Sequence, residues 1–396
     1  MIIKSLAPVI FEFLKEIEAQ GFSLCLVGGV PRDYFYTGTM GNDFDFEIRP
    51  SEVLDDPEKS WPLFYKKLHN YLSQKKLAFT ELPYLITRVY FEGFFFEFSS
   101  PRTERNLPDN FSHHHFTADL NPSLSYKQSF KRRDFTINGI GVELHFNTVS
   151  EKTVDPYNGL EDLKNGVLKN ISEDFFFDSV RFLRLIRFHI KFEKFSIHEK
   201  ILSQLHQFVL TELSIHHFKE ELFKSRPGAF LNTFSELVIS RKLIIPDAFV
   251  FWTRYLFPEN IATREELLAF VYLKNDKDAE KIVSFFSMPE KKLKDLKSFH
   301  RSVLELKELG KEDMIHLISL PIEVSLKSPI LKELKNLEEK KEWRSVFYLF
   351  LDFKLPLDWN EWENVIVDQE EINKISPSSR SYYQFYKALL LKYSDG

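Results

Sequence analysis

Hydrophobic and polar positions follow two different periods along this chain, and the change falls near residue 175. Before it, a helically spaced apolar pattern at the N-terminus is followed by the short apolar runs SLCLVGG and DFDFEI, which are typical of buried strands. Two further runs, YLITRVYF and FFFEFSS, meet at Glu92 and Gly93 as in a tight hairpin. After residue 175 the pattern is almost entirely 3.6-periodic, as in VRFLRLIRFHI. We therefore expect an α+β N-terminal head, with a small mixed sheet and helices, followed by an all-α C-terminal half.

The length of 396 residues allows more than one hydrophobic core, because single cores rarely exceed about 250 residues. Candidate domain boundaries are a polar loop over residues 103–128, the turn at 155–166 and the helix-breaking Arg-Pro-Gly sequence at 226–228. We predict a catalytic head over residues 1–150, a helical neck over 151–225, and a helical body and tail over 226–396. The helical runs of the tail include one near residues 343–353.

Composition places the chain among folded globular proteins, with 43% hydrophobic and 28% charged residues. The single cysteine, Cys25, excludes an intrachain disulfide and a four-thiolate zinc site, and it fits a reducing cytoplasm. The N-terminal pattern predicts an amphipathic helix rather than a signal peptide. We expect no membrane span, because no window approaches about 18 uncharged apolar residues. The net charge of −5 does not decide whether nucleic acid binds.

The segment GNDFDFEIRP, residues 41–50, sets acidic residues into an otherwise buried strand. Strand alternation places Asp43, Asp45 and Glu47 on one face and the phenylalanines on the other. A divalent cation, for which we expect Mg²⁺, would offset the repulsion of the first two carboxylates. The alternative for an isolated pair is a solvated acidic edge. For Glu47 we expect only a solvated neighbour without a role.

Two other features favour a phosphoryl-transfer site over a solvated edge. In FFFEFSS, alternation separates Glu97 from the phenylalanine face, so that a neighbouring strand could bring it beside the acidic pair. Three such carboxylates are typical of two-metal centres, whose ions lie roughly 4 Å apart. Upstream, LVGGVPRD places Gly28 and Gly29 between a strand and a helix starting near Pro31, where Arg32 adds positive charge for a triphosphate.

Five ordered blocks resemble the nucleotidyltransferases of the DNA polymerase β superfamily, in the class of CCA-adding tRNA nucleotidyltransferases and bacterial poly(A) polymerases. The blocks lie within residues 26–195 and read LVGGVPRD, DFDFEI, FSSPRTER, KRRDFTINGIGVE with DPYNGLEDLKNGVLKNI, and FDSVRFLRLIRF. The resemblance implies that the 3′-hydroxyl of a tRNA end attacks the α-phosphate of CTP or ATP at two Mg²⁺ ions and releases pyrophosphate.

The resemblance also implies roles for single residues. Asp43 and Asp45 correspond to the metal ligands, and Glu97 to the third catalytic carboxylate. The implied nucleotide-binding residues are Gly28, Gly29, Arg32, Arg133, Asp134, Asn138, Asp178, Arg181, Arg184 and Arg187.

The last four of these residues lie in FDSVRFLRLIRF, at every third position beside an apolar stripe. In the family this helix reads the incoming base. A carboxylate with a guanidinium can accept from the amino group and donate to the ring nitrogen that cytosine and adenine share. Without the upstream blocks, a surface helix with an Asp178–Arg181 pair would explain the same pattern.

Several alternatives stay open. Phe177 stands where the family usually has Glu, which leaves the orientation of the base-reading pair undecided. We favour CCA addition over poly(A) addition, over addition of only C or only A, and over a catalytically inactive RNA-binding relative. For the triplet His113 to His115 we favour a mobile polar loop near the active site over a metal site. If tRNA binds, lysines of basic runs such as EKKLKDLKSFHR are expected to contact its backbone.

Overall fold

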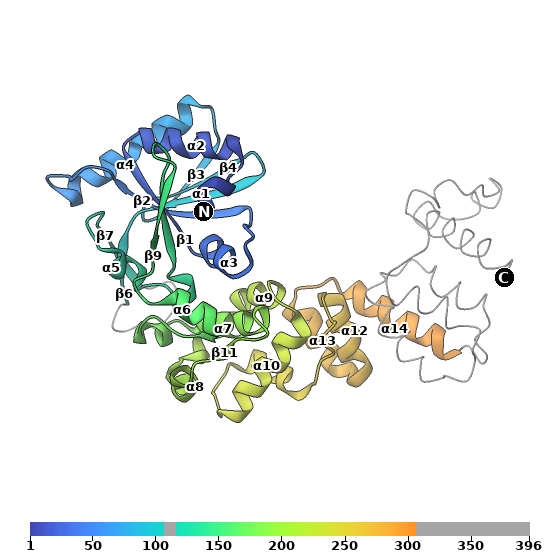
Figure 1. The fold of residues 1–396 in the computed structure, drawn as a ribbon. Coiled ribbons are helices and arrows are strands. Elements are labelled where there is room, and N and C mark those ends of the chain that lie inside the picture. The colour runs from blue at the N-terminus through green and yellow to red at the C-terminus, as the bar shows by residue number, and fades with distance from the viewer. Residues whose placement is uncertain (107–115, 306–396) are drawn as a thin grey trace, which may run out of the picture. The chain divides into compact units, whose positions relative to one another are not determined.

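The computed structural model describes residues 1–106 and 116–305 (Figure 1). Its contacts divide the chain into two units. The first contains residues 1–221 and 236–246, and the second contains residues 222–235 and those from 247 onward. The expected triplet His113 to His115 and the helix near residues 343–353 lie outside the described residues. The division at residues 150 and 225 stays a prediction.

A seven-stranded mixed sheet forms the centre of the first unit, in the order β3-β4-β5-β2-β1-β8-β9 (Figure 1). Neighbouring strands are antiparallel except β2 and β5, which pair in parallel. The strands are β1 Phe22–Val27, β2 Asp43–Pro50, β3 Phe79–Leu82, β4 Ile86–Phe91, β5 Phe94–Ser99, β8 Gly141–His145 and β9 Ser150–Val154. The expected hairpin between β4 and β5 is confirmed, with Glu92 at φ 50° and Gly93 at φ 84°.

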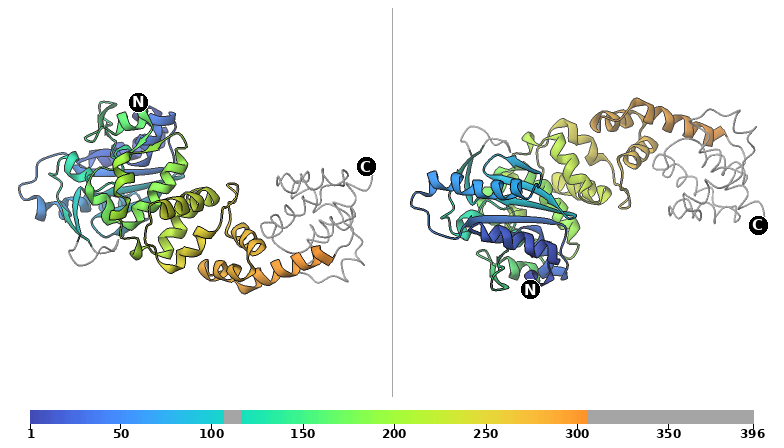
Figure 2. Two further views of the ribbon diagram at one scale, coloured as in Figure 1. Left: turned by 90° about the horizontal axis from the view of Figure 1, so that it is seen from below. Right: turned by 90° about the horizontal axis from the view of Figure 1, so that it is seen from above.

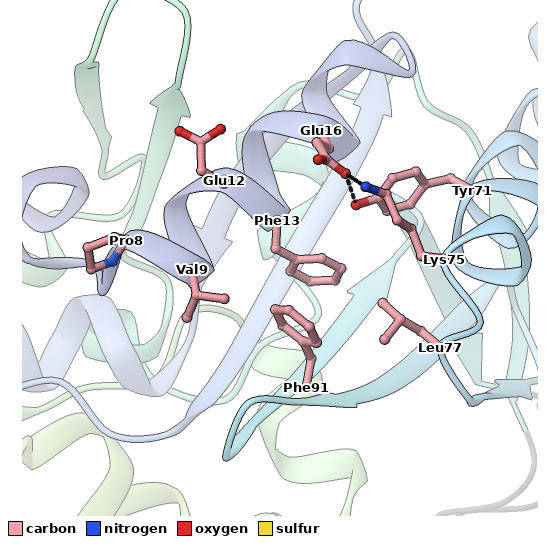
Figure 3. Close-up of a pocket in the computed structure, with 9 residues that line it drawn as sticks. All are labelled: Pro8, Val9, Glu12, Phe13, Glu16, Tyr71, Lys75, Leu77 and Phe91. Atoms are coloured by element: carbon pink, nitrogen blue, oxygen red, sulfur yellow. Dashed lines mark hydrogen bonds and ion pairs between the residues drawn. The ribbon is translucent and has the colours of Figure 1, made fainter.

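One face of the sheet is covered by α2 (Pro8–Ala19) and α4 (Pro57–Gln74), which cross the strands on the near side when the molecule is viewed from above (Figure 2, right). The phenylalanines of β2 and β5 pack there in stacked pairs, with Phe46 and Phe98 at 5.6 Å between ring centroids. A pocket of about 490 Å³ lies on this covered side, lined by α2, the end of α4 and Phe91 (Figure 3). None of the predicted site residues lines it.

Helices dominate the chain after residue 175 as far as the structure describes it, as the periodicity predicted. The other helices up to residue 223 are α1 Ile2–Ser5, α3 Gly29–Thr37, α5 Tyr126–Phe130, α6 Gly159–Asn165, α7 Ser179–Lys191, α8 Glu199–Gln204 and α9 Ile215–Phe223. Those that follow are α10 Pro227–Ser240, α11 Asp247–Val250, α12 Arg264–Lys274, α13 Asp276–Phe285 and α14 Glu290–Glu305. Short 3-10 turns are η1 Thr136–Asn138, η2 Glu173–Phe177, η3 Leu205–Gln207, η4 Leu210–Glu212 and η5 Phe251–Arg254. A two-stranded parallel ladder joins β10 Val167–Leu168 and β11 Ser196–Ile197.

None of the helices described in these residues is long and apolar enough to cross a membrane. The single cysteine is buried and free.

The prediction of a polar loop over residues 103–128 is wrong in part, because the described part of this segment contains strands and a helix. Strands β6 (Arg102–Asn106) and β7 (Phe116–Leu120) pair as an antiparallel ribbon, and α5 follows. Helix α5 begins with a capping box, in which the Ser125 hydroxyl and the Gln128 side chain bond reciprocally to backbone N–H groups. Polarity alone concealed these elements, because a two-stranded ribbon needs no continuous apolar run.

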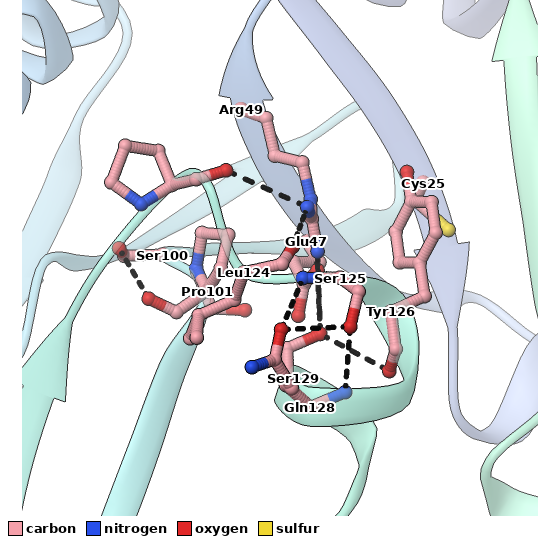
Figure 4. A network of polar contacts seen from close by, with 12 residues as sticks. Cys25, Glu47, Arg49, Ser100, Pro101, Leu124, Ser125, Tyr126, Gln128 and Ser129 are labelled. Atoms are coloured by element: carbon pink, nitrogen blue, oxygen red, sulfur yellow. Dashed lines mark hydrogen bonds and ion pairs between the residues drawn. The ribbon is translucent and has the colours of Figure 1, made fainter. Parts of the chain in front are cut away.

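The expectation that Glu47 is a solvated neighbour is wrong, because only 1% of its surface is exposed. Its Oε1 accepts from the Arg49 guanidinium at 2.5 Å and from the Ser129 hydroxyl of α5 at 3.1 Å (Figure 4). Arg49 in turn donates to the Leu124 carbonyl and lies over the Tyr126 ring, 4.1 Å from its centroid. Helix α5 therefore covers this end of the acidic face, and the Glu47–Arg49 pair of β2 connects to α5 by hydrogen bonds.

We predict that Arg49→Met lowers the free energy of unfolding by about 3 kcal/mol, because it leaves the Glu47 carboxylate buried and without its counter-charge. Removing both charges in Glu47→Gln/Arg49→Met should recover part of that loss. Urea denaturation measures both effects. The matched control is Lys59→Met, which removes an exposed ion pair with Asp56 and should change stability by less than about 0.5 kcal/mol. Equal effects of Arg49→Met and Lys59→Met would contradict the assignment.

Candidate functional site

The predicted acidic cluster lies on the face of the sheet opposite α2 and α4. The parallel register of β2 and β5 sets Asp45 opposite Glu97 and Asp43 opposite Phe95. Asp43 is exposed, whereas Asp45 is partly buried. The structure thus brings the three predicted carboxylates to neighbouring positions on one face.

Glu97 has a cationic partner that the sequence pattern did not reveal. Arg88 of β4 lies opposite Glu97 in the antiparallel register, and its Nε donates to Glu97 Oε2 at 2.7 Å. The Arg88 side chain of this pair is 64% exposed to solvent. The signal that could have found it is the alternation of YLITRVYF, which puts Arg88 on the face away from the buried Val89.

The acidic face carries excess negative charge. Burial raises the pKa of Asp45 to about 6, the Arg133 guanidinium opposes this rise, and the carboxylates of Glu97 and Asp43 add to it. Within residues 1–106 and 116–305, no three His, Cys, Asp or Glu side chains form a group able to hold a metal ion. The donor set still suits Mg²⁺, which commonly takes one or two carboxylates and completes its shell with phosphates and water. Asp43 and Asp45 are the residues that would hold it.

The glycine turn lies directly against this cluster. Gly28 adopts φ 79°, and a Cβ atom at this position would be 3.1 Å from Asp45 Oδ2 and 3.4 Å from Arg133 Nη1. Helix α3 begins at Gly29, two residues before the expected start at Pro31. The turn, one carboxylate and one predicted nucleotide-binding arginine therefore meet at one point, where a side chain has little room.

A buried polar network connects this point to α3 and α7. Arg32 is 5% exposed and donates from Nη1 to Asn138 Oδ1 at 2.5 Å. Asn138 Nδ2 donates to Asp134 Oδ1 at 2.8 Å, and Arg184 donates to Asp134 Oδ2 through Nε at 2.7 Å. Arg133 Nη1 reaches the Asn138 carbonyl at 3.3 Å. Five predicted nucleotide-binding residues are thus joined by these contacts.

Asp134 is the anionic centre of this network. Burial disfavours its ionised form, but the Arg184 guanidinium, the Asn138 amide and the Phe135 N–H together hold the pKa of the Asp134 carboxyl well below its usual range. The carboxylate is therefore fixed in its charged form, and it orients Asn138 and Arg184. These contacts make Asp134 a residue that positions its neighbours.

The start of α7 contains a second, separate group. Asp178 caps the helix by accepting from the Val180 N–H at 2.9 Å, and its Oδ2 lies 3.7 Å from Arg181 Nε. Arg181 also donates to the Arg132 carbonyl at 2.6 Å. Arg187 forms an ion pair with Glu221. The apolar stripe of the helix is buried as predicted.

Asp33 is a residue of the site region that sequence reasoning missed. It accepts from Arg32 Nε at 2.8 Å and from Lys191 of α7 at 3.0 Å. The guanidinium of Arg32 lies between this carboxylate and the rings of Phe188 and Phe192, at 5.1 and 5.5 Å from their centroids. Its position next to Arg32 in PRD was the available signal.

The sheet, with a glycine turn facing two strand carboxylates, has the arrangement that the sequence resemblance predicts for a nucleotidyltransferase head. Residues 24–169 match the family described as the Poly A polymerase head domain. The resemblance inferred from the motifs is therefore confirmed. Through this segment the chain is similar to the Poly A polymerase head domain and to the CCA-adding enzymes among its relatives.

Two curated relatives and one solved structure illustrate the similarity. The CCA-adding enzyme of Coxiella burnetii (strain RSA 493 / Nine Mile phase I) is 41% identical over 113 residues, 28% of each chain. The CCA-adding enzyme of Lactobacillus helveticus (strain DPC 4571) is 29% identical over 220 residues, 54% of this chain and 49% of the relative. These matches thus span half of each relative or less. The crystal structure of the Bacillus stearothermophilus CCA-adding enzyme in complex with CTP shares the fold, with a TM-score of 0.57 at 14% identity, over 98% of this chain and 94% of the other.

We predict that Gly28→Ala weakens CTP binding at least tenfold, about 1.4 kcal/mol, because the added methyl group would press on Asp45 and Arg133. Gly93→Ala is the matched control, since Gly93 has a similar φ of 84° but no atom within 4 Å of the place that an added methyl group would take. Both variants should lose about 1–3 kcal/mol of stability, because a positive φ strains any residue that has a Cβ atom. Equilibrium dialysis with CTP separates them, and equal CTP affinities would refute the crowded turn.

Proposed function

We propose that this protein is a template-independent tRNA nucleotidyltransferase that adds C, C and A to the tRNA 3′ end from CTP and ATP. The observation that carries the proposal is the meeting of Asp45, the Gly28 turn and Arg133 at one point of the acidic face. The CCA-adding enzymes among the relatives support it. The single cysteine is compatible with the cytoplasm, where we expect the activity.

Asp43 and Asp45 are proposed to hold Mg²⁺, with Glu97 as the third carboxylate beside them. Bound there, the ions would lower the pKa of the attacking hydroxyl and stabilise the charge on the leaving pyrophosphate. The backbone N–H groups at the start of α3, with Gly28 and Gly29, are suited to a triphosphate because the N-terminus of a helix favours anions and glycines allow close approach to the backbone. Arg133 adds positive charge at the same point.

Arg32, Asp134, Asn138 and Arg184 are proposed to shape the nucleotide pocket. Their hydrogen bonds fix each side chain before a nucleotide binds, which reduces the ordering that binding must achieve. Asn138 joins the other residues of this arrangement, since it contacts Arg32, Arg133 and Asp134.

Base selection is proposed to rest on Asp178 and Arg181 at the start of α7. Their side chains already lie together, with a carboxylate oxygen 3.7 Å from a guanidinium nitrogen. A carboxylate and a guanidinium side by side match the donor and acceptor edge that cytosine and adenine share. Phe177, which is 42% exposed, directly precedes this pair.

The test is incubation of purified protein and Mg²⁺ with tRNA that ends before its CCA, in the presence of CTP, ATP or both. We predict ordered addition of C, C and A, resolved as single-nucleotide steps on a sequencing gel. Long A tails would instead identify a poly(A) polymerase, and addition of only C or only A would identify a partial enzyme.

Asp45→Ala is the control, and it should abolish incorporation while RNA binding stays within about twofold. If wild-type protein bound tRNA without adding any nucleotide, the enzyme proposal would fail in favour of an inactive RNA-binding relative.

A further inference from the structure

Two aromatic side chains stand exposed on the acidic face. Tyr90 of β4 is 59% exposed and Phe95 of β5 is 57% exposed, and their ring centroids lie 4.8 Å apart. On the covered face of the same strands, Val89 and Phe96 are at most 2% exposed. The exposed pair therefore contributes little to the core of the head.

The strand register fixes the place of this pair. Tyr90 lies opposite Phe95, and Phe95 lies opposite Asp43 on the next strand. Two residues further along, Arg88, Glu97 and Asp45 form the neighbouring row. Since a strand advances about 3.3 Å per residue, the aromatic row lies about 7 Å from the row of Asp45 and Glu97.

A cross-strand aromatic pair has a structural explanation, because such pairs stabilise a sheet modestly. Single exposed apolar residues are also ordinary. This pair differs in its location, because Phe95 lies immediately beside Asp43. In the proposed function, the reacting 3′-hydroxyl must approach the carboxylates of Asp43 and Asp45. An aromatic surface at that place suits a ligand with flat, stackable groups.

We propose that Tyr90 and Phe95 form a stacking platform for the terminal bases of the single-stranded RNA primer. The proposal rests on the proposed function, which requires the primer end to lie at Asp43 and Asp45. Stacking on aromatic rings accepts every base, because each base has a π-face. This tolerance fits a primer whose last base changes after each addition, whereas a site that reads base edges would hold only one of the successive ends.

The chemistry of the occupant follows from the neighbouring charges. Acidic proteins, anionic lipids and RNA would all be repelled by Asp43 and Glu97, but the proposed function places divalent cations at Asp43 and Asp45, and these would offset the repulsion of RNA phosphates there. A single RNA strand can place its bases on the rings and its sugar end toward the carboxylates. Arg88, two residues before Tyr90 on β4, pairs with Glu97 and offsets the charge of that carboxylate in the neighbouring row.

The experiment uses an RNA hairpin with a short single-stranded 3′ end whose last base is 2-aminopurine, without any nucleoside triphosphate. Stacking quenches the fluorescence of 2-aminopurine, so the wild-type chain should quench it on binding. Tyr90→Ala and Phe95→Ala should abolish most of the quenching and weaken primer binding roughly tenfold. In steady-state assays they should raise KM for the primer and leave KM for CTP unchanged.

Conservative variants separate stacking from folding. Tyr90→Phe and Phe95→Tyr keep a ring at each position and should retain the quenching. Leu63→Ala is the matched control for loss of exposed apolar surface, since Leu63 is 67% exposed on α4, across the covered face. It should change neither readout.

The two proposals fail separately, because the quenching needs no catalysis. If the wild-type chain adds nucleotides while the alanine variants keep normal quenching and primer KM, the platform is refuted and the enzyme stands. If quenching depends on the two rings but no nucleotide is added, the platform stands and the proposed activity is refuted.

Discussion

The parallel pairing of β2 with β5 is the constraint on which the whole acidic face depends. It sets Asp45 opposite Glu97, and a slip by one residue would turn every carboxylate into the covered face. Stacked phenylalanine pairs across the two strands, such as Phe46 with Phe98, hold this register from the covered side. Apolar packing on the covered face of the sheet therefore holds in place the mutually repelling carboxylates on the opposite face.

A second arrangement, centred on Asp134, connects that face to the helical neck. Its carboxylate is buried and is held ionised by Arg184 and Asn138, while Arg32 completes the chain of contacts to α3. Such a network is stable only when every member is present, because an unpaired buried charge is costly. Helix α7 is thereby fixed relative to the glycine turn, as the proposed nucleotide pocket requires.

Local patterns predicted much of the fold and of the site. Alternation in DFDFEI and FFFEFSS gave the correct faces for Asp43, Asp45 and Glu97, and the helical period gave α7 with its buried stripe. What local patterns could not supply was the set of partners brought from far along the chain. Glu47 is buried, and one of its hydrogen-bond partners is Ser129, some 80 residues later. Arg88 pairs with Glu97 only through the hairpin register.

The central claim is that Asp43 and Asp45 hold a divalent cation together with the nucleotide. Electron paramagnetic resonance of Mn²⁺, which suits the same oxygen ligands as Mg²⁺, counts the ions bound to the protein in the presence of CTP without primer. The account predicts that the wild-type chain retains Mn²⁺ with CTP, and that Asp43→Asn/Asp45→Asn retains the fold but not the bound ion. Equal Mn²⁺ retention by the wild-type chain and this variant would contradict the account.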